Sequence, residues 1–223
     1  MKKTLLMAAL AAAVVGGALG CGGGRSGVKP APPSVSTFTD TRDGKVYKIV
    51  QIGRQVWFAE NLNYDAEGSV CYENSADSCA KYGRLYDWNT AMKACPVGTR
   101  LPTDKEWTAL TDAVGGEKTA GTMLKSSTGW NSYDRILLPV SRDEYGFSAL
   151  PGGYGYGDDP FKYAGKFGCW WSATEFDAIS VDYYGRHARM RGIYYLSENV
   201  DRYQYGKANQ FSVRCVADKE AKK

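Results

Sequence analysis

The chain has 223 residues, of which 43% are hydrophobic and 13% aromatic. A hydrophobic fraction of this size supports a packed core and excludes a chain that is disordered throughout. The formal charge is +4 at pH 7, from 28 Lys and Arg against 24 Asp and Glu. A charge so close to balance argues against nucleic acid as a partner.

The first twenty residues have the pattern of a secretory signal peptide. Lys2 and Lys3 form a basic start, and Thr4 to Leu19 are almost all apolar or small. The apolar run is about 15 residues long, which is shorter than a confident membrane span. We therefore expect residues 1–20 to be removed on export.

The end of the apolar run, Ala18-Leu19-Gly20-Cys21, resembles the lipobox of bacterial lipoproteins. The resemblance implies cleavage before Cys21, followed by acylation of its thiol and of the new N-terminus. Several acyl chains anchor a protein firmly, because each buried methylene contributes about 0.8 kcal/mol. Gly22 follows the cysteine, where Asp would favour retention in the inner membrane. We therefore expect a lipid-anchored protein of the bacterial outer membrane or cell surface, with an ordinary signal peptide as the alternative.

Composition divides the rest of the chain into three parts. Residues 21–39 are dominated by Gly, Ser and Pro after the cysteine, which predicts a flexible linker. Residues 40–217 carry the periodic hydrophobic patterns of one folded domain. Residues 218–223 are a charged tail.

The domain begins with a predicted β-hairpin. Residues 45–52 and 55–58 are rich in β-branched and aromatic side chains and flank Gly53-Arg54, a two-residue loop. We expect four apolar residues of the hairpin to share its core face: Val50, Ile52, Val56 and Phe58.

Two helices are predicted after the hairpin. Residues 85–94 have helical periodicity with Asp87 as a candidate N-cap, and they place Met92 and Cys95 on the inner face. The second helix begins at a capping box formed by Thr103 and Glu106. Its buried stripe would contain Trp107, Leu110 and Val114, and Gly115-Gly116 would end it.

The second half of the domain contains more loops and more aromatic residues. The patterns predict a short helix over 119–125, an aromatic loop over 154–160, a strand over 169–174, a pair of strands over 179–196 and a last strand over 211–216.

Six cysteines in an exported chain indicate an oxidising compartment. If Cys21 carries lipid, five remain, so at least one stays free or pairs with another chain. Cys71 and Cys79 enclose a short polar loop, and we expect them to pair.

Cys215 has two candidate partners, of which we favour Cys95. A bond to Cys95 would join the first helix to the last strand and would leave Cys169 as a buried thiol. The alternative is a bond between Cys169 and Cys215, both in predicted core strands. The chain has no CxxC pair, and its single histidine, His187, lies among charged residues. We therefore expect no metal site and no cofactor.

Seven stretches together resemble one family. They are DGKVYK (43–48), VWFAENLN (56–63), YGRLYDW (82–88), CPVGTRLPTDKEW (95–107), GFSALPGG (146–153), WWSATE (170–175) and FSVRC (211–215). The domain is identified by them as a member of the FISUMP family, the Fibrobacter succinogenes major paralogous domain of bacterial surface lipoproteins. Residues 176–209 match least, so no ligand preference is carried over there.

The capped helix of Leu101-Pro-Thr to Trp107 is also similar to a motif of formylglycine-generating domains, which have a C-type lectin-like fold. The resemblance implies an α+β fold with two main helices, a twisted antiparallel sheet and long loops. The link from Cys95 to Cys215 is similar to the defining disulfide of lectin-like folds.

The sequence is less informative about function than about fold. The expected lipid anchor, linker and aromatic second half favour a non-enzymatic surface module that binds a polysaccharide or an envelope protein. The candidate aromatics are Tyr154, Tyr156, Trp170, Trp171, Tyr183, Tyr184, Tyr194 and Tyr195. We single out Tyr154, Tyr156, Trp170, Tyr183 and Tyr184, and because side chains alternate along a strand, about half of the tyrosines should face inward.

Two alternatives remain. One is an enzyme of the formylglycine-generating type, which requires a pair of reactive cysteines. The other is a Ca²⁺-dependent lectin, whose Glu-Pro-Asn and Trp-Asn-Asp signatures the chain lacks.

Overall fold

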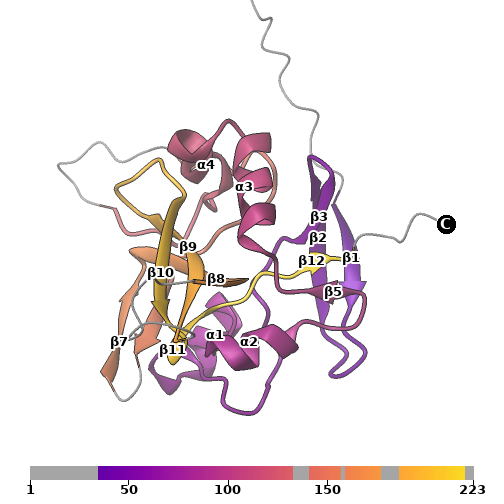
Figure 1. The fold of residues 1–223 in the computed structure, drawn as a ribbon, viewed down its shortest axis with the longest axis vertical. Helices are drawn as coiled ribbons and strands as arrows, with labels where there is room; N and C mark the ends of the chain where they lie inside the picture. The colour runs from indigo at the N-terminus through magenta and orange to yellow at the C-terminus, as the bar shows by residue number, and fades with distance from the viewer. Residues whose placement is uncertain (1–34, 133–140, 157–158, 177–185, 219–223) are drawn as a thin grey trace, which may run out of the picture.

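The computed structural model of the chain describes residues 35–132, 141–156, 159–176 and 186–218 (Figure 1). The described residues form an α+β fold of two sheets, four α-helices and one 3₁₀ helix, which confirms the predicted class. The helices are η1 (Tyr72–Asn74), α1 (Ala76–Tyr82), α2 (Trp88–Ala94), α3 (Asp104–Ala113) and α4 (Glu117–Leu124).

The smaller sheet has five strands in the order β1-β2-β3-β12-β5, and every pair in it is antiparallel. These strands are β1 (Val35–Thr39), β2 (Val46–Ile52), β3 (Gln55–Phe58), β5 (Thr99–Arg100) and β12 (Val216–Ala217). The hairpin expected around Gly53-Arg54 is therefore confirmed as β2 and β3.

The strand β1 corrects the predicted limit of the linker. Its five residues pair with β2 along their whole length, and the ring of Phe38 lies 5.3 Å from that of Phe58. The run Val-Ser-Thr-Phe-Thr is β-branched and aromatic, so it has high strand propensity although it follows a Gly- and Pro-rich segment. The folded part of the chain thus includes residues 35–39.

The hairpin faces were also predicted wrongly. Val50 lies opposite Trp57, and residues opposite each other in an antiparallel pair share a face. Trp57 therefore packs with Val50 and Ile52, while Val56 and Phe58 point to the other side. Both faces carry buried side chains, so a simple alternation of inside and outside did not apply.

The larger sheet is mixed. Its path is β10-β9-β8-β11-β6-β7, β4 pairs with β11, and β8 runs parallel to both β6 and β11. The single antiparallel sheet implied by the resemblance is corrected accordingly. The strands are β4 (Leu85–Tyr86), β6 (Gly152–Tyr156), β7 (Asp159–Ala164), β8 (Phe167–Glu175), β9 (His187–Tyr194), β10 (Asp201–Gly206) and β11 (Asn209–Ser212).

Three predictions in the second half change in detail. Within 154–160, expected to be a loop, residues 154–156 and 159–160 belong to the antiparallel pair β6 and β7. The pair of strands expected over 179–196 has one member in the described chain, β9, whose partners are β8 and β10. The last strand is divided in two, because the chain leaves the larger sheet after Ser212 and joins the smaller one at Val216.

The helix caps follow the sequence closely, although Leu85 and Tyr86, expected in the first helix, form strand β4 instead. The side chain of Asp87 accepts a hydrogen bond from the amide of Thr90 at the start of α2. At α3 the capping box is complete: Thr103 Oγ1 accepts from the amide of Glu106, and Glu106 Oε2 accepts from the amide of Thr103. The predicted stripe of α3 is buried, whereas Met92 of α2 is exposed, contrary to prediction.

The core divides into two clusters on opposite faces of β8. Trp171 belongs to the cluster with α2, and Trp170 belongs to the cluster with α3 and α4. Figure 1 shows α3 and α4 above the β8–β9 region and α1 and α2 below it. Neighbouring tryptophans thus point in opposite directions, as side chains along a strand do.

Two disulfides are present, between Cys71 and Cys79 and between Cys95 and Cys215. Both expected pairings are confirmed, and the alternative bond to Cys169 is wrong. Cys169 is a buried free thiol in β8. Within the described residues, no helix has both the length and the apolar composition to cross a bilayer.

Candidate functional site

An open pocket of about 390 Å³ lies on one face of the larger sheet. We call it the aromatic pocket, because six of the eight described residues that line it are aromatic. The eight are Tyr154, Tyr163, Phe167, Tyr194, Ser197, Asp201, Tyr203 and Tyr205. Another cleft of about 440 Å³, between β2 and α1, has a mainly polar lining that includes several lysines.

Strand alternation on the edge strand β10 builds one wall. Asp201, Tyr203 and Tyr205 are two residues apart, so their side chains leave the same face of the sheet. On β9, Gly192 lies opposite Asp201. A Cβ atom at Gly192 would lie 2.6 Å from Cζ of Phe167, so the absence of a side chain there allows that ring to cover β9.

The strands β6 and β7 supply the second wall. The rings of Tyr154 and Tyr163 lie 5.8 Å apart between centroids. A Cβ atom at Gly153 would lie 2.5 Å from the carbonyl oxygen of Lys162, so glycine is needed for this close approach of the two strands. Tyr163 has φ of 67°, in the left-handed region that costs a non-glycine residue about 1–2 kcal/mol. Residues held in such conformations cluster at functional sites.

The pocket rests on the core through Phe211. The rings of Tyr154 and Tyr205 meet Phe211 edge-on, at 5.8 and 5.5 Å between centroids, and Phe211 packs against Trp171 at 4.5 Å. Tyr154 and Tyr205 are therefore half-buried and fixed from below. Tyr163 and Tyr203 form the open rim, with 48% and 39% of their surface exposed.

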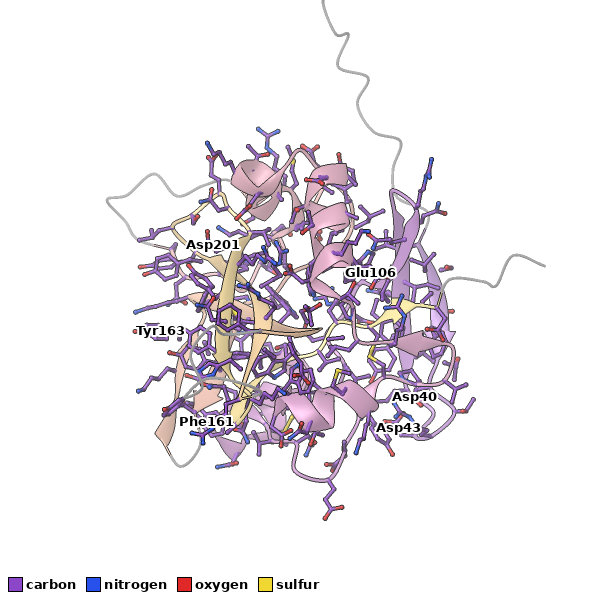
Figure 2. The ribbon with its side chains drawn as sticks, viewed as in Figure 1. Asp40, Asp43, Glu106, Phe161, Tyr163 and Asp201 are labelled. Atoms are coloured by element: carbon purple, nitrogen blue, oxygen red, sulfur yellow. A yellow bond between two sulfur atoms is a disulfide. The ribbon has the colours of Figure 1, made fainter. Side chains whose placement is uncertain are left out.

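Burial controls the protonation of the pocket tyrosines. It raises the pKa of Tyr154 and Tyr205 above the ordinary value. It also raises the pKa of Tyr203, to which the charge of Asp201 and a hydrogen bond with that carboxylate contribute further. These hydroxyls therefore stay protonated and can donate hydrogen bonds. The pocket combines ring faces, hydroxyl donors and one carboxylate, and Figure 2 shows Tyr163 and Asp201 on the side of the molecule away from Glu106 and Asp40.

The sequence-based candidates are divided by the structure. Tyr154 and Tyr194 line the pocket. Tyr156 is 54% exposed but does not line it. Trp170 is only 1% exposed, and Trp171 and Tyr195 are buried too, so these three cannot stack on a ligand. Tyr183 and Tyr184 lie outside the described residues.

Five aromatic or acidic lining residues were missed: Tyr163, Phe167, Asp201, Tyr203 and Tyr205. The spacing of the last three is a recognisable signal of one strand face. The position of Phe167 over Gly192 has no such local signal, because it depends on the pairing of β8 with β9.

The geometry gives little support to the two alternative functions, a formylglycine-generating enzyme and a Ca²⁺-dependent lectin. Four cysteines are used in the two disulfides, and burial raises the pKa of the Cys169 thiol well above its usual range, which disfavours a reactive thiolate. In the part of the chain that the structure describes, no three His, Cys, Asp or Glu residues are grouped so as to hold a metal ion.

Comparison with known proteins gives one match. The family model of the Fibrobacter succinogenes major domain matches residues 50–217. No curated protein and no solved structure matches significantly. The match covers the aromatic pocket and both core clusters except Tyr47, and it agrees with the resemblance seen in the sequence motifs.

Proposed function

The chain belongs to the Fibrobacter succinogenes major domain family, and from this membership and its aromatic pocket we propose that it is a non-enzymatic module that binds saccharide units. The observation that carries the proposal is the gathering of six aromatic rings in one open pocket. A pyranose ring has apolar C–H faces that pack on aromatic rings and hydroxyls at its edge that need polar partners.

The size and lining of the pocket suit such a ligand. Its volume of about 390 Å³ lies within the range of small-molecule sites, which are mainly apolar and have a few placed polar groups. Tyrosine supplies both a ring face and a hydroxyl. The half-buried rings fixed on Phe211 need little ordering on binding, which favours affinity.

We further propose that a lipid on Cys21 holds the module at the bacterial outer membrane or cell surface. The support is the signal-peptide pattern and lipobox in residues 1–21. Cys21→Ser should abolish incorporation of labelled palmitate. Unchanged labelling would overturn the assignment of Cys21.

The proposal includes a C-type lectin-like fold. It is supported by the disulfide between the end of α2 and the segment before β12, and by the α+β composition of the described residues. An experimental structure of the domain, superposed on lectin-like domains, tests this part. A different order of strands around the Cys95–Cys215 link would overturn it.

The binding experiment uses the full exported chain with Cys21→Ser, so that it stays soluble. Neutral, amino and acidic hexasaccharides are titrated by calorimetry, and the proteins compared are the parent, Tyr163→Ala and Tyr156→Ala. We expect Tyr163→Ala to lose affinity about fivefold, since stacked aromatic contacts of this kind contribute on the order of 1 kcal/mol. Tyr156→Ala removes an equally exposed tyrosine outside the pocket and should bind as the parent does.

Two results would overturn the saccharide proposal. One is a parent protein that binds none of the oligosaccharides, which would leave an envelope protein as the partner to seek. The other is equal affinity of Tyr163→Ala and Tyr156→Ala.

A further inference from the structure

The described lining of the aromatic pocket contains one charged group, the carboxylate of Asp201. Asp201 is the first residue of β10 and is half-buried. Its neighbour across the strand pair is Gly192, over which the rings of Phe167 and Tyr203 lie. The carboxylate therefore lines the pocket beside aromatic rings.

The carboxylate of Asp201 can accept hydrogen bonds from a ligand. Burial, together with the charge of Asp201, raises the pKa of Tyr203, so its hydroxyl stays protonated as one donor in the pocket. A carboxylate has two oxygens and about four acceptor sites, so further donors can be accommodated. A ligand that brings several N–H donors to this point would complete the set.

The surrounding rings favour a positive charge at the same place. The faces of aromatic rings carry negative electrostatic potential and attract ammonium groups within about 6 Å of the ring centre. The rings of Phe167 and Tyr203 lie 6.4 Å apart, and both meet at Gly192, the residue opposite Asp201. The ring faces and the carboxylate thus both attract a positively charged group. Partial burial weakens the screening of this attraction by water.

We propose that the aromatic pocket selects amino sugars with a free, protonated amino group, and that Asp201 is the residue that determines this specificity. This inference rests on the proposed saccharide-binding function and names its ligand class. A glucosamine-type unit would stack its ring on the tyrosines and direct its ammonium group to Asp201. Acetylation of the amino group removes the charge, and a uronic acid would bring a second carboxylate toward the first.

The charge of the whole protein does not supply this preference. Without residues 1–20, which contain Lys2 and Lys3 and no acidic residue, 26 basic against 24 acidic residues leave a formal charge of +2, so long-range attraction would not favour basic saccharides. A preference for amino sugars would therefore have to arise locally, in the pocket.

The test compares glucosamine, N-acetylglucosamine, glucose and galacturonic acid hexasaccharides at about pH 6, where an amino group is protonated. The proteins are the full exported chain with Cys21→Ser and the same chain with Asp201→Asn or Asp112→Asn. Asparagine at 201 keeps the size of the side chain and can still accept hydrogen bonds. Asp112 is an exposed residue of α3 that does not line the pocket, so its variant is a matched control for loss of one negative charge.

We expect the parent and Asp112→Asn to bind the glucosamine hexamer about tenfold more tightly than the N-acetylated and neutral hexamers, with added salt reducing the difference. Asp201→Asn should bind the glucosamine, N-acetylated and neutral hexamers with equal affinity. Thermal melting of each variant confirms that the fold is retained.

Failure of this inference can be told from failure of the proposed function. Equal binding of all hexamers that is lost in Tyr163→Ala would refute selection of amino sugars and leave the saccharide site in place. A preference that persists in Asp201→Asn would refute the role of Asp201. Absence of binding by every hexamer would overturn both proposals.

Discussion

Arg214 is fully buried and donates two hydrogen bonds, from Nε at 3.1 Å and Nη2 at 2.8 Å, to the side-chain oxygen of Asn61. Trp170 donates a third hydrogen bond to the same oxygen, at 2.8 Å. Arg214 also donates to the carbonyl oxygens of Phe58 and Phe147. Burial lowers the pKa of Arg214 to about 9, so these partners must offset the desolvation of a cation. The contact joins the end of β3, the segment between β11 and β12, and β8.

Asn61→Ala should therefore destabilise the domain strongly. The substitution leaves Arg214 and the indole N–H of Trp170 without a common acceptor, and breaking a buried polar set of this kind costs about 3–5 kcal/mol. Urea unfolding measures the change. Asn63→Ala is the control, because the recorded hydrogen bonds of Asn63 use its backbone atoms. A loss at Asn61 no larger than that at Asn63 would contradict this account.

The two disulfides should differ in their contribution to stability. Cys95 and Cys215 are 120 residues apart, and Cys71 and Cys79 are 8 apart. Loop-closure entropy assigns about 4.7 kcal/mol to a loop of roughly 100 residues and about 2–3 kcal/mol to a short one. Replacing both cysteines of each pair by serine should therefore lower stability more for the long loop, as measured by chemical unfolding. The reverse order would show that the entropic argument does not govern this fold.

Glu106 should give the domain an acid-sensitive contribution. Its carboxylate accepts hydrogen bonds from Arg100 at 2.6 and 2.7 Å, and with the bonds from Thr103 this lowers its pKa from 4.5 to about 2. Because the folded pKa lies below the unfolded one, the contribution is complete above about pH 4.5 and is lost as pH falls toward 2.

Urea unfolding at a series of pH values tests this with Glu106→Gln. The stability difference between parent and variant should be constant near neutral pH and should shrink between pH 4.5 and 2. Glu117→Gln, at an exposed site in the first turn of α4, is the control. A difference that does not depend on pH would remove Glu106 as the cause.

Lys125 should make the stability of the domain depend on pH in the alkaline range, whereas Glu106 does so in the acid range. Its ammonium group is buried and donates to the carbonyl oxygens of Tyr195 and Ser197 at 3.2 and 2.6 Å. Burial lowers its pKa from 10.5 to about 8. Between these values the unfolded chain binds more protons, so the contribution of Lys125 to stability rises with pH.

In Lys125→Met this rise should be absent, so the parent should gain stability relative to the variant as pH increases from 8 to 10.5. Chemical unfolding across this range measures it. Lys118→Met, at an exposed position of α4, should run parallel to the parent. If the stability of Lys125→Met also changes with pH in parallel with the parent, the prediction is contradicted.

At Tyr163, replacement by glycine should destabilise the domain less than replacement by alanine, which is the reverse of the usual order. Its φ of 67° suits glycine, whereas alanine retains most of the strain. Tyr163→Gly should therefore be more stable than Tyr163→Ala by about 1 kcal/mol, while both lose the pocket ring. At Tyr203, which has no positive φ, alanine should be the more stable replacement. Thermal melting of the four variants measures their stabilities. If alanine is the more stable replacement at both positions, Tyr163 is not strained.

Local signals were the part of the fold that the sequence revealed well. The Thr103–Glu106 box and the Gly53-Arg54 loop involve residues that are close in sequence, so their geometry depends little on the rest of the chain. Both were predicted at the correct residues. The pairing of Cys95 with Cys215 was favoured over its alternative by the positions expected for a helix end and a final strand.

Long-range packing was harder to predict. Alternation along the expected last strand gave no reason to bury Arg214, whose partners come from distant segments. The same limit applies to the aromatic pocket. Tyr203 and Tyr205 have a readable spacing, but Tyr163 and Phe167 join them only through the pairing of strands β6 to β9. Composition also suggested Trp170 as a ligand-binding residue, although it belongs to the core.

The strand β1 has a consequence for any proteolytic shedding of the domain from its proposed anchor. A cut ahead of Val35 would release a domain with every strand of the smaller sheet in place. A cut just after Thr39 would take β1 away, exposing the backbone edge of β2 and the ring of Phe58. Unpaired edges of this kind attract strands of other molecules. Five residues thus separate a soluble shed form from a self-associating one.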